Sequence, residues 1–214
     1  MVLVFDCVDL NKSYGENVVL HDVNISLPEG VSASLISASG GGKTTLLNII
    51  GGLSAPDTGS VIFEGKDLVD LDEDEQAAVR RKKIGILHQS SYLFPWLSVD
   101  ENILMTPMGE NYDEWIKNMR RGFEIESFSQ TPVNKLSGGQ RRRVCLLRAF
   151  QMGGKLLLLD EPSTGLDSKL RGFLLESINE AKMRGTTVLV ATHDPEISNK
   201  TDEKIILQNG SVQV

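Results

Sequence analysis

The chain has 214 residues, of which 40% are hydrophobic and 24% are charged, and its formal net charge is −7. This length and composition are those of a globular chain that buries one large core, with room for a smaller subdomain. The acidic balance argues against a protein that binds nucleic acid or anionic lipid, because both need a basic surface.

The first 89 residues alternate predicted strands with turns and helices, which is the pattern of an α/β domain. Strands are expected at residues 2–10, 18–27, 31–36, 59–63 and 84–87, and helices at residues 45–53 and 70–83. The second of these helices begins with acids and ends with bases. This order suits the helix dipole and favours a solvated helix over a binding patch.

The composition shifts at residues 90–135, and the simplest interpretation is a small, mostly helical insertion. Within it, helices are expected at residues 99–105 and 113–121, followed by a polar, poorly periodic segment at 124–134. The α/β pattern then returns, with helices expected at residues 140–152 and 167–184, strands at 155–159 and 186–191, and a hairpin at 204–214. Asp167 is predicted to cap the start of its helix, and Asn209-Gly210 to form the type I′ turn of the hairpin.

Cysteine usage and apolar runs bear on the compartment. Cys7 and Cys145 have neither metal nor redox spacing, so we expect two buried thiols in a reducing compartment. The first residues lack the basic region and the long apolar segment of a signal peptide. The apolar runs, such as residues 156–159, fall far short of the roughly 20 residues that span a bilayer. We therefore expect a soluble chain.

A glycine-rich stretch between the third strand and the first helix, residues 37–45, has the composition of a phosphate-binding loop. Its glycines at 40–42 let backbone N–H groups point inward, where the helix dipole has its positive end. Lys43 supplies a charge to the phosphates of a nucleotide, and the Thr44 hydroxyl is placed to ligate Mg²⁺. Ser37 stands where the pattern G-x-x-x-x-G-K-[ST] has its first glycine, which puts the entry turn of this phosphate loop in doubt. The alternative is a turn without a ligand, in which a Lys-Thr pair would have little purpose.

Two adjacent acids, Asp160 and Glu161, follow the apolar strand at 155–159. At the carboxyl edge of a parallel sheet, Asp160 can hold the Mg²⁺ shell while Glu161 orients or deprotonates a water at the γ-phosphate. The alternative is a pair of acids that cap a surface turn before Pro162. The phosphate loop on the same edge makes that alternative the weaker one.

A second glycine turn, Leu-Ser-Gly-Gly-Gln at residues 136–140, opens the helix at 140–152. The Ser137 hydroxyl, the Gly139 N–H group and the helix N-terminus form an anion site by geometry. The chain therefore has two predicted phosphate-binding sites.

The order of these motifs resembles that of the ATP-binding-cassette (ABC) ATPases, and the resemblance covers essentially the whole chain. It implies an α/β fold: a P-loop NTPase core with a mostly parallel sheet, an N-terminal antiparallel β subdomain and a small helical subdomain insertion. Residues 1–214 would form a single ABC ATPase domain, with the core at 1–89 and 136–214 and the helical subdomain at about 90–135. Residues 137–140 resemble the signature motif, which contacts the ATP held by a partner subunit, and we call them the signature turn.

The same resemblance implies a role for each matching residue. Catalysis is expected from Glu161, His193 and Gln89. ATP binding is expected from Tyr14, which would stack on adenine, and from Ser39, Gly40, Gly41, Gly42, Lys43, Thr44 and Thr45. Contact with the ATP of the partner subunit is expected from Ser137, Gly138, Gly139, Gln140 and Asp167. Mg²⁺ is expected to be held by Thr44, Gln89 and Asp160.

Four of the groups singled out have a structural alternative. Tyr14 is alternatively a core aromatic, and His193 is alternatively a strand-end cap. Arg141-Arg142-Arg143 stand at a helix start, where the dipole disfavours cations, so they lie either near the triphosphate or on a solvated face. The aromatic stretch at 92–97 belongs either to the core of the helical subdomain or to the groove that receives a membrane subunit in this family.

The resemblance predicts the ATP-binding and hydrolysing subunit of an ABC transporter, which closes as a head-to-tail homodimer on ATP and Mg²⁺. Closure would move partner permease subunits, so we expect a cytoplasmic chain, peripheral on the inner face of the cell membrane, with no nucleic-acid partner. Residues 160–167 and the overall length resemble the small exporter and lipoprotein-release type.

Three other functions remain as alternatives. The first is a force-transmitting ABC ATPase that acts on a membrane partner without transport. A soluble ABC ATPase is less favoured, because those proteins carry long coiled-coil insertions or a second cassette. A P-loop kinase would leave the signature turn without a task. The cargo and the direction of transport stay open.

Overall fold

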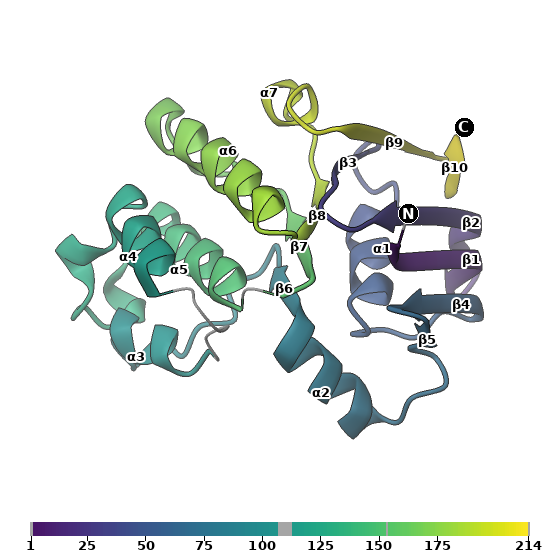
Figure 1. The fold of residues 1–214 in the computed structure, drawn as a ribbon, viewed down its shortest axis with the longest axis horizontal. Helices are drawn as coiled ribbons and strands as arrows, with labels where there is room; N and C mark the ends of the chain where they lie inside the picture. The colour runs from purple at the N-terminus through teal and green to yellow at the C-terminus, as the bar shows by residue number, and fades with distance from the viewer. Residues whose placement is uncertain (1, 107–112, 153, 214) are drawn as a thin grey trace.

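The computed structural model describes residues 2–106, 113–152 and 154–213, which form two sheets and the helices that cover them (Figure 1). The smaller sheet is antiparallel, in the order β2-β1-β4-β5. Its strands are β1 (Leu3–Tyr14), β2 (Asn17–Pro28), β4 (Thr58–Phe63) and β5 (Lys66–Asp67). Val23, Ile25 and Leu27 of β2 alternate toward the core, because successive side chains of a strand point to opposite faces. The predicted N-terminal antiparallel β subdomain is confirmed.

The larger sheet is parallel except at one edge, in the order β10-β9-β3-β8-β7-β6. Its strands are β3 (Ser32–Ile36), β6 (Ile84–Leu87), β7 (Leu156–Asp160), β8 (Thr187–Ala191), β9 (Glu203–Gln208) and the antiparallel β10 (Ser211–Gln213). β7 and β8 bury every residue, since layers on both faces cover them, and this explains their unbroken apolar runs. Between β9 and β10, Asn209 and Gly210 have φ values of 52° and 81°, as a type I′ turn requires. Val214, at the end of the predicted hairpin, lies outside the described residues.

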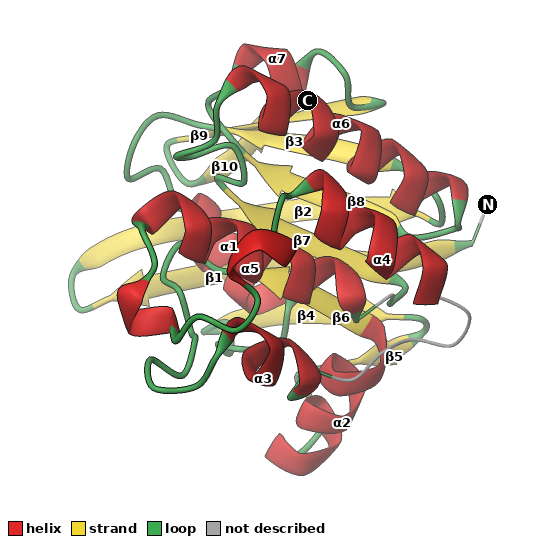
Figure 2. Ribbon diagram, turned by 90° about the vertical axis from the view of Figure 1, so that its left-hand side faces the viewer, coloured by secondary structure: helices red, strands yellow, loops and turns green. Residues whose placement is uncertain are grey.

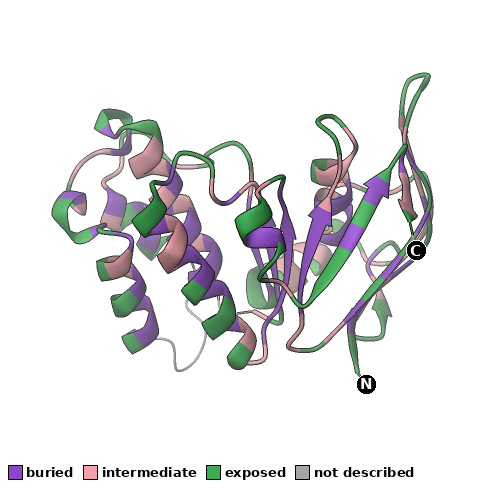
Figure 3. Ribbon diagram, turned by 90° about the horizontal axis from the view of Figure 1, so that it is seen from above, coloured by how far each residue is buried: buried purple, intermediate pink, exposed green. Residues whose placement is uncertain are grey.

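The helices form layers on the two faces of the larger sheet. α1 (Lys43–Ile50) lies between the two sheets and fills the core that they share. α5 (Gly138–Gln151) and α6 (Ser168–Met183) cover the opposite face (Figure 2). Figure 3 shows the buried strands in the middle and the exposed sides of the helices outside. α2 (Glu73–Lys83) buries no residue, which confirms the predicted solvated helix. The short α7 (Pro195–Ser198) precedes β9.

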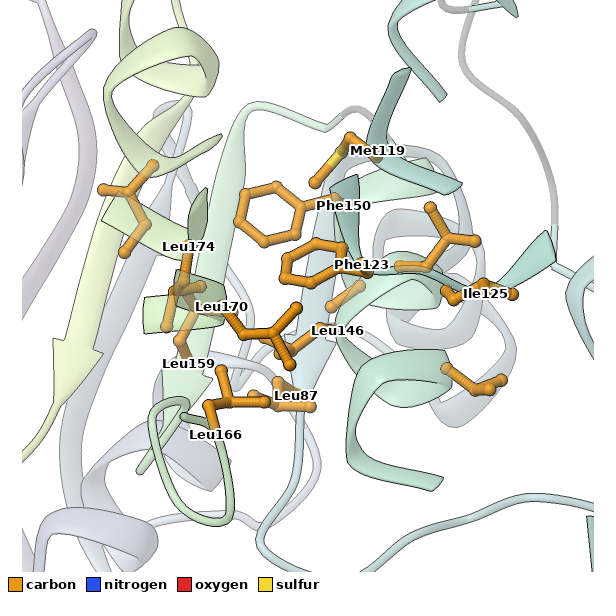
Figure 4. Close-up of a cluster of buried hydrophobic side chains, with 14 of the residues drawn as sticks. Leu87, Met119, Phe123, Ile125, Leu146, Phe150, Leu159, Leu166, Leu170 and Leu174 are labelled. Atoms are coloured by element: carbon orange, nitrogen blue, oxygen red, sulfur yellow. The ribbon is translucent and has the colours of Figure 1, made fainter. Parts of the chain in front are cut away.

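Residues 90–135 contain α3 (Val99–Leu104), α4 (Asp113–Gly122) and two 3₁₀ turns, Glu126–Phe128 and Val133–Lys135. Their apolar side chains pack against α5 and α6 in one cluster (Figure 4). The segment at 124–134, which is polar and poorly periodic in sequence, nevertheless buries Ile125, Phe128 and Val133. Separate short turns place these side chains in the core, so their spacing in the sequence follows neither the helix period nor the strand period.

Two glycines allow close contacts around α5 and α6. A Cβ atom at Gly85 of β6 would lie 2.2 Å from the carbonyl oxygen of Ala149 in α5. A Cβ atom at Gly122 would lie 2.0 Å from Cζ of Phe173 in α6. α5 therefore sits directly on the strand that leads to Gln89, and the end of α4 sits on α6.

Neither cysteine forms a disulfide. Cys7 is buried and Cys145 is half-buried, so the expectation of two buried thiols holds fully only for Cys7. Burial is the main cause of the raised pKa of both thiols. No helix within the described ranges is long and apolar enough to span a bilayer.

Candidate functional site

A cavity of about 980 Å³ opens at the carboxyl ends of the parallel strands and gathers most of the predicted site. Every predicted site residue lines this cavity except Ser137, Gln140 and Asp167. β7 and β8 are paired up to Asp160 and Ala191, so both strands end at the same edge. Strand ends of an open parallel sheet are where ligands bind in such folds.

The phosphate loop has the geometry of an anion site. Gly40 and Gly42 have φ values of 78° and 90°, in the left-handed region that favours glycine. A Cβ atom at Gly42 would also lie 3.1 Å from the carbonyl oxygen of Val19. Gly42 caps α1 without any side-chain hydrogen bond, so the N–H groups of the first turn are left to a ligand in the cavity.

Ser37 fits the loop entry without strain, because its φ is not in the left-handed region. Its hydroxyl donates to the carbonyl oxygen of Ala38 at 3.0 Å. Lys43 Nζ donates to the carbonyl oxygen of Ser37 at 3.2 Å and to Ser37 Oγ at 3.4 Å. The missing first glycine thus leaves the lysine and the loop in place.

The two acids meet the phosphate loop at the end of β7. Thr44 Oγ1 donates to Asp160 Oδ2 at 2.6 Å, and Asp160 is buried. Lys43 Nζ lies 3.8 Å from Glu161 Oε1. Glu161 has a φ of 48°, a left-handed conformation that costs about 1–3 kcal/mol for a residue with a side chain. Such strain persists only where the surroundings fix the backbone, and it is typical of active sites.

Glu161 also contacts His193, which lies two residues after the end of β8. His193 Nδ1 lies 2.8 Å from Glu161 Oε2, but the pair lacks the alignment of a hydrogen bond. Oε2 is therefore buried and has no hydrogen-bond donor among the described residues. Asp194, rather than His193, caps the next helix, since its Oδ1 accepts from Glu196 N at 2.9 Å. The strand-end alternative for His193 is thereby weakened.

The oxygen ligands around Thr44 suit Mg²⁺, but they do not by themselves complete a coordination shell. No group of three or more His, Cys, Asp or Glu side chains is placed to hold a metal within the described ranges. The Thr44 hydroxyl and the Asp160 carboxylate are adjacent, and Gln89 is exposed at the same cavity. A few oxygen ligands, completed by phosphate oxygens and water, are the shell that Mg²⁺ takes in nucleotide sites.

The signature turn lies at the far side of the cavity. Ser137 caps α5: its Oγ accepts from Gln140 N at 3.2 Å, and Gln140 Oε1 accepts from Ser137 N at 2.8 Å. Gly138 and Gly139 line the cavity of their own chain. Asp167 caps α6 as predicted, with its Oδ1 accepting from Leu170 N at 2.9 Å. Ser137, Gln140 and Asp167 thus each have a structural role within the chain.

Tyr14 is not a core aromatic. Its side chain is 55% exposed at the rim of the cavity, and Lys12 Nζ lies 5.5 Å from the ring centroid. An exposed ring at the rim can stack on a planar base.

The burial of Arg142 was not predicted from the sequence. Arg142 is not on a solvated face, because it lines the cavity, is 8% exposed and donates to the carbonyl oxygens of His88 and Glu161 at 2.8 and 2.6 Å. The sequence held a signal for this burial: Arg142, Leu146 and Phe150 recur at four-residue spacing on the buried face of α5. Arg141 and Arg143 are half-buried and bond the carbonyl oxygens of Leu136 and Phe123.

The aromatic stretch at 92–97 divides between the two alternatives. Leu93 packs against the core cluster, whereas Tyr92 and Trp96 are 68% and 72% exposed. Tyr92 borders a second cavity of about 640 Å³ between α1, β6 and α5. Three arginines, Arg80, Arg81 and Arg148, also line this groove.

Comparison with known proteins agrees with this geometry. The family model described as ABC transporter matches residues 20–164. A second model, described as AAA domain, putative AbiEii toxin, Type IV TA system, matches residues 130–199. Macrolide export ATP-binding/permease protein MacB of Campylobacter jejuni is 37% identical over 206 residues, which are 94% of this chain and 32% of that protein. The chain thus spans about a third of the length of that relative.

Two further similarities cover nearly full lengths. Lipoprotein-releasing system ATP-binding protein LolD of Leptospira interrogans is 34% identical over 211 residues, which are 95% of this chain and 88% of LolD. Among solved structures, the dimeric post-hydrolysis state of the ATP-binding cassette MJ0796 bound to ADP and Pi superposes with a TM-score of 0.88. The two are 32% identical, and the match covers 98% of this chain and 97% of MJ0796.

Proposed function

The chain belongs to the ABC transporter family as an ATP-binding cassette, an ATPase, and we propose that Glu161 is the base of its hydrolytic reaction. The observation that carries this role is Glu161 Oε2, a buried carboxylate oxygen without a hydrogen-bond donor at the edge of the cavity. Such an oxygen can orient a water and take its proton. His193 beside Glu161 would contact the γ-phosphate, and Gln89 would contact the water or the metal.

The phosphate loop would bind the β- and γ-phosphates through the N–H groups at the start of α1 and through Lys43. Thr44, Asp160 and Gln89 would hold Mg²⁺, which when bound neutralises charge on the phosphates. Tyr14 would stack on the adenine, and its exposed ring at the rim of the cavity supports this.

Two copies would close head to tail, each ATP lying between the phosphate loop of one copy and the signature turn of the other. Ser137, Gly138 and Asp167 are exposed, as residues that face a second copy must be. The Ser137 hydroxyl, which accepts one hydrogen bond as a cap, keeps its proton to donate to a phosphate oxygen. The dimeric MJ0796 cassette provides a precedent for this assembly.

The permease partner would dock on the groove beside Tyr92, at the inner face of the cell membrane. Exposed Tyr92 and Trp96, together with the apolar lining at Leu53 and Met152, support an interface there. By similarity to LolD and MacB, the partner would be of the exporter or lipoprotein-release type. Transmission of force to a membrane partner without transport remains the second candidate, since the same groove would serve it. We also propose that residues 1–214 act as one cassette, with its core at 1–89 and 136–214.

ATP hydrolysis by the purified chain, with and without Mg²⁺, tests this proposal. Glu161→Gln should lower kcat by about 100-fold or more because the amide cannot accept the proton of the water. The same variant should keep ATP bound and remain a dimer in gel filtration with ATP. A Glu161→Gln variant that hydrolyses ATP at the native rate, or that stays monomeric with ATP, would overturn the proposal.

A further inference from the structure

Arg142, an arginine of α5, connects three parts of the site. Arg142 lies in the second turn of α5, and 8% of its surface is exposed. Its Nη1 donates to the carbonyl oxygen of His88 at 2.8 Å, directly before Gln89. Its Nη2 donates to the carbonyl oxygens of Asp160 and, at 2.6 Å, of Glu161. The side chain thus joins α5 to the main chain at both acids.

The backbone that Arg142 contacts is the strained part of the site. Glu161 holds its left-handed φ of 48° with one bond from its N–H group to Ala191 and one from Thr164 N to its carbonyl oxygen, at 2.8 and 3.2 Å. A guanidinium is planar, and its donors have a fixed fork geometry, so it fixes the relative orientation of the carbonyl groups that it binds. The bond from Arg142 therefore restrains the peptide units on which the Glu161 side chain depends.

Arg142 lines the cavity but forms no ion pair with a described carboxylate. No carboxylate oxygen of the described residues lies within ion-pair distance of it. Burial of a cation is unfavourable, and here main-chain carbonyl oxygens and the nearby charges of Asp160 and Glu161 compensate for it. The guanidinium binds the carbonyl oxygens of His88, Asp160 and Glu161 together, which indicates a geometric role.

We propose that Arg142 is a positioning residue, which holds the peptide units of Asp160 and Glu161 so that the Glu161 carboxylate points into the cavity. It also couples α5 to this carboxylate, so that a shift of the signature turn would change the orientation of the Glu161 carboxylate in the same chain. The inference rests on the proposed role of Glu161 as the base. In this proposal Arg142 acts through the backbone of Glu161, although its side chain also lines the cavity.

The test compares Arg142→Gln, Arg142→Lys and a control in the same helix, Arg143→Gln. Arg143 also donates to a main-chain carbonyl oxygen, that of Phe123 at 3.0 Å, but this bond leads to the helical insertion. We expect Arg142→Gln to lower kcat by about 10- to 100-fold, because a small misplacement of a catalytic group has effects of that size. The Kd for ATP should change by less than about threefold, since Lys43 and the phosphate loop are untouched. Arg142→Lys, which keeps the charge and part of the donor set, should have an intermediate kcat.

Each result decides the matter. A kcat of Arg142→Gln within about twofold of native would overturn the proposal, and so would a rise in Kd that matches the loss of kcat. Equal losses in Arg142→Gln and Arg143→Gln would show a general weakening of α5 and would also overturn it. Urea unfolding identifies a variant that does not fold. If Arg142→Gln does not fold, the proposal is judged by Arg142→Lys, which should lower kcat while its Kd for ATP stays unchanged. Absence of hydrolysis in the native chain would contradict the proposed function instead, so the two failures are distinguishable.

Discussion

Gly41 approaches Ser37 so closely that a Cβ atom at position 41 would lie 2.7 Å from Ser37 Oγ. The serine that replaces the first glycine of the loop is therefore accommodated by the absence of a side chain four residues later. The two positions form a unit at the entry of the phosphate loop, and their substitutions should be coupled.

Ser37→Gly should leave the Kd for ATP within about threefold of native, because the N–H donors of residues 40–45 do not depend on the hydroxyl. Gly41→Ala should weaken ATP binding at least about tenfold, since the methyl group collides with Ser37 and the loop must shift. Adding Ser37→Gly to Gly41→Ala should recover part of that loss. Equilibrium binding of ATP to the three variants checks this double-mutant cycle, and purely additive effects would contradict the coupling.

Ser137→Arg should abolish hydrolysis while ATP still binds, because a long cation at the exposed start of α5 would block closure of two copies. Both Ser137→Arg and the control Ser137→Ala lose the cap on Gln140 N, which costs about 1 kcal/mol. Only the arginine adds bulk, so it should have the much larger effect on kcat. Native ATPase activity in Ser137→Arg would refute the role of the signature turn in a second site.

Gly122→Ala should destabilise the chain by about 1–3 kcal/mol, because the added methyl group would lie 2.0 Å from Phe173 Cζ. The Phe173 ring has little room to move, since it packs edge-to-face on Phe123 with 4.9 Å between centroids. Gly172→Ala in α6 is the matched control: a Cβ atom there meets nothing within 4 Å. This control should instead stabilise by about 0.5–1 kcal/mol. Urea unfolding measures both, and effects of the same sign would contradict the packing at Gly122.

Asp202 should contribute to stability in a pH-dependent way. Burial raises its pKa, but hydrogen bonds from Lys182 and from the side chain and backbone of Ser32 outweigh burial and lower the pKa from 3.8 to about 2. Because the folded pKa lies below the unfolded value, the contribution is full above about pH 4 and is lost as the pH falls toward 2. It should be modest, since 42% of the carboxylate side chain is exposed and solvent screens the pair.

Asp202→Asn should therefore be less stable than native at pH 6, and the difference should shrink between pH 4 and pH 2. Unfolding by urea at several pH values gives this difference, and an NMR titration of the Asp202 carboxyl gives its midpoint directly. A stability difference that stays constant from pH 6 to pH 2 would argue against the hydrogen bonds at Asp202.

Local chemistry in the sequence was enough for most of the elements and for most of the cavity lining, but not for β5 and α7. The strand at 84–87, the cap at Asp167 and the turn at Asn209-Gly210 lie where predicted, because each depends on neighbouring residues alone. Thr44 and Asp160 meet at the carboxyl edge of the parallel sheet, because Thr44 follows β3 and Asp160 ends β7. The roles assigned to the site residues remain predictions.

Contacts between residues far apart in the chain could not be predicted in this way. The burial of Ile125 and Phe128 depends on where short turns place them against α5 and α6. Neither the helix nor the strand periodicity of the sequence indicates that placement. The bonds of Arg142 to His88 and Glu161 join residues 54 and 19 positions apart. The sequence by itself determined most of the strands, the predicted cap at Asp167 and the phosphate loop, since these follow from adjacent residues. Only the tertiary structure decided which carbonyl groups the Arg142 guanidinium binds and that Glu161 adopts a left-handed backbone, because both depend on how α5 packs beside the ends of β6 and β7.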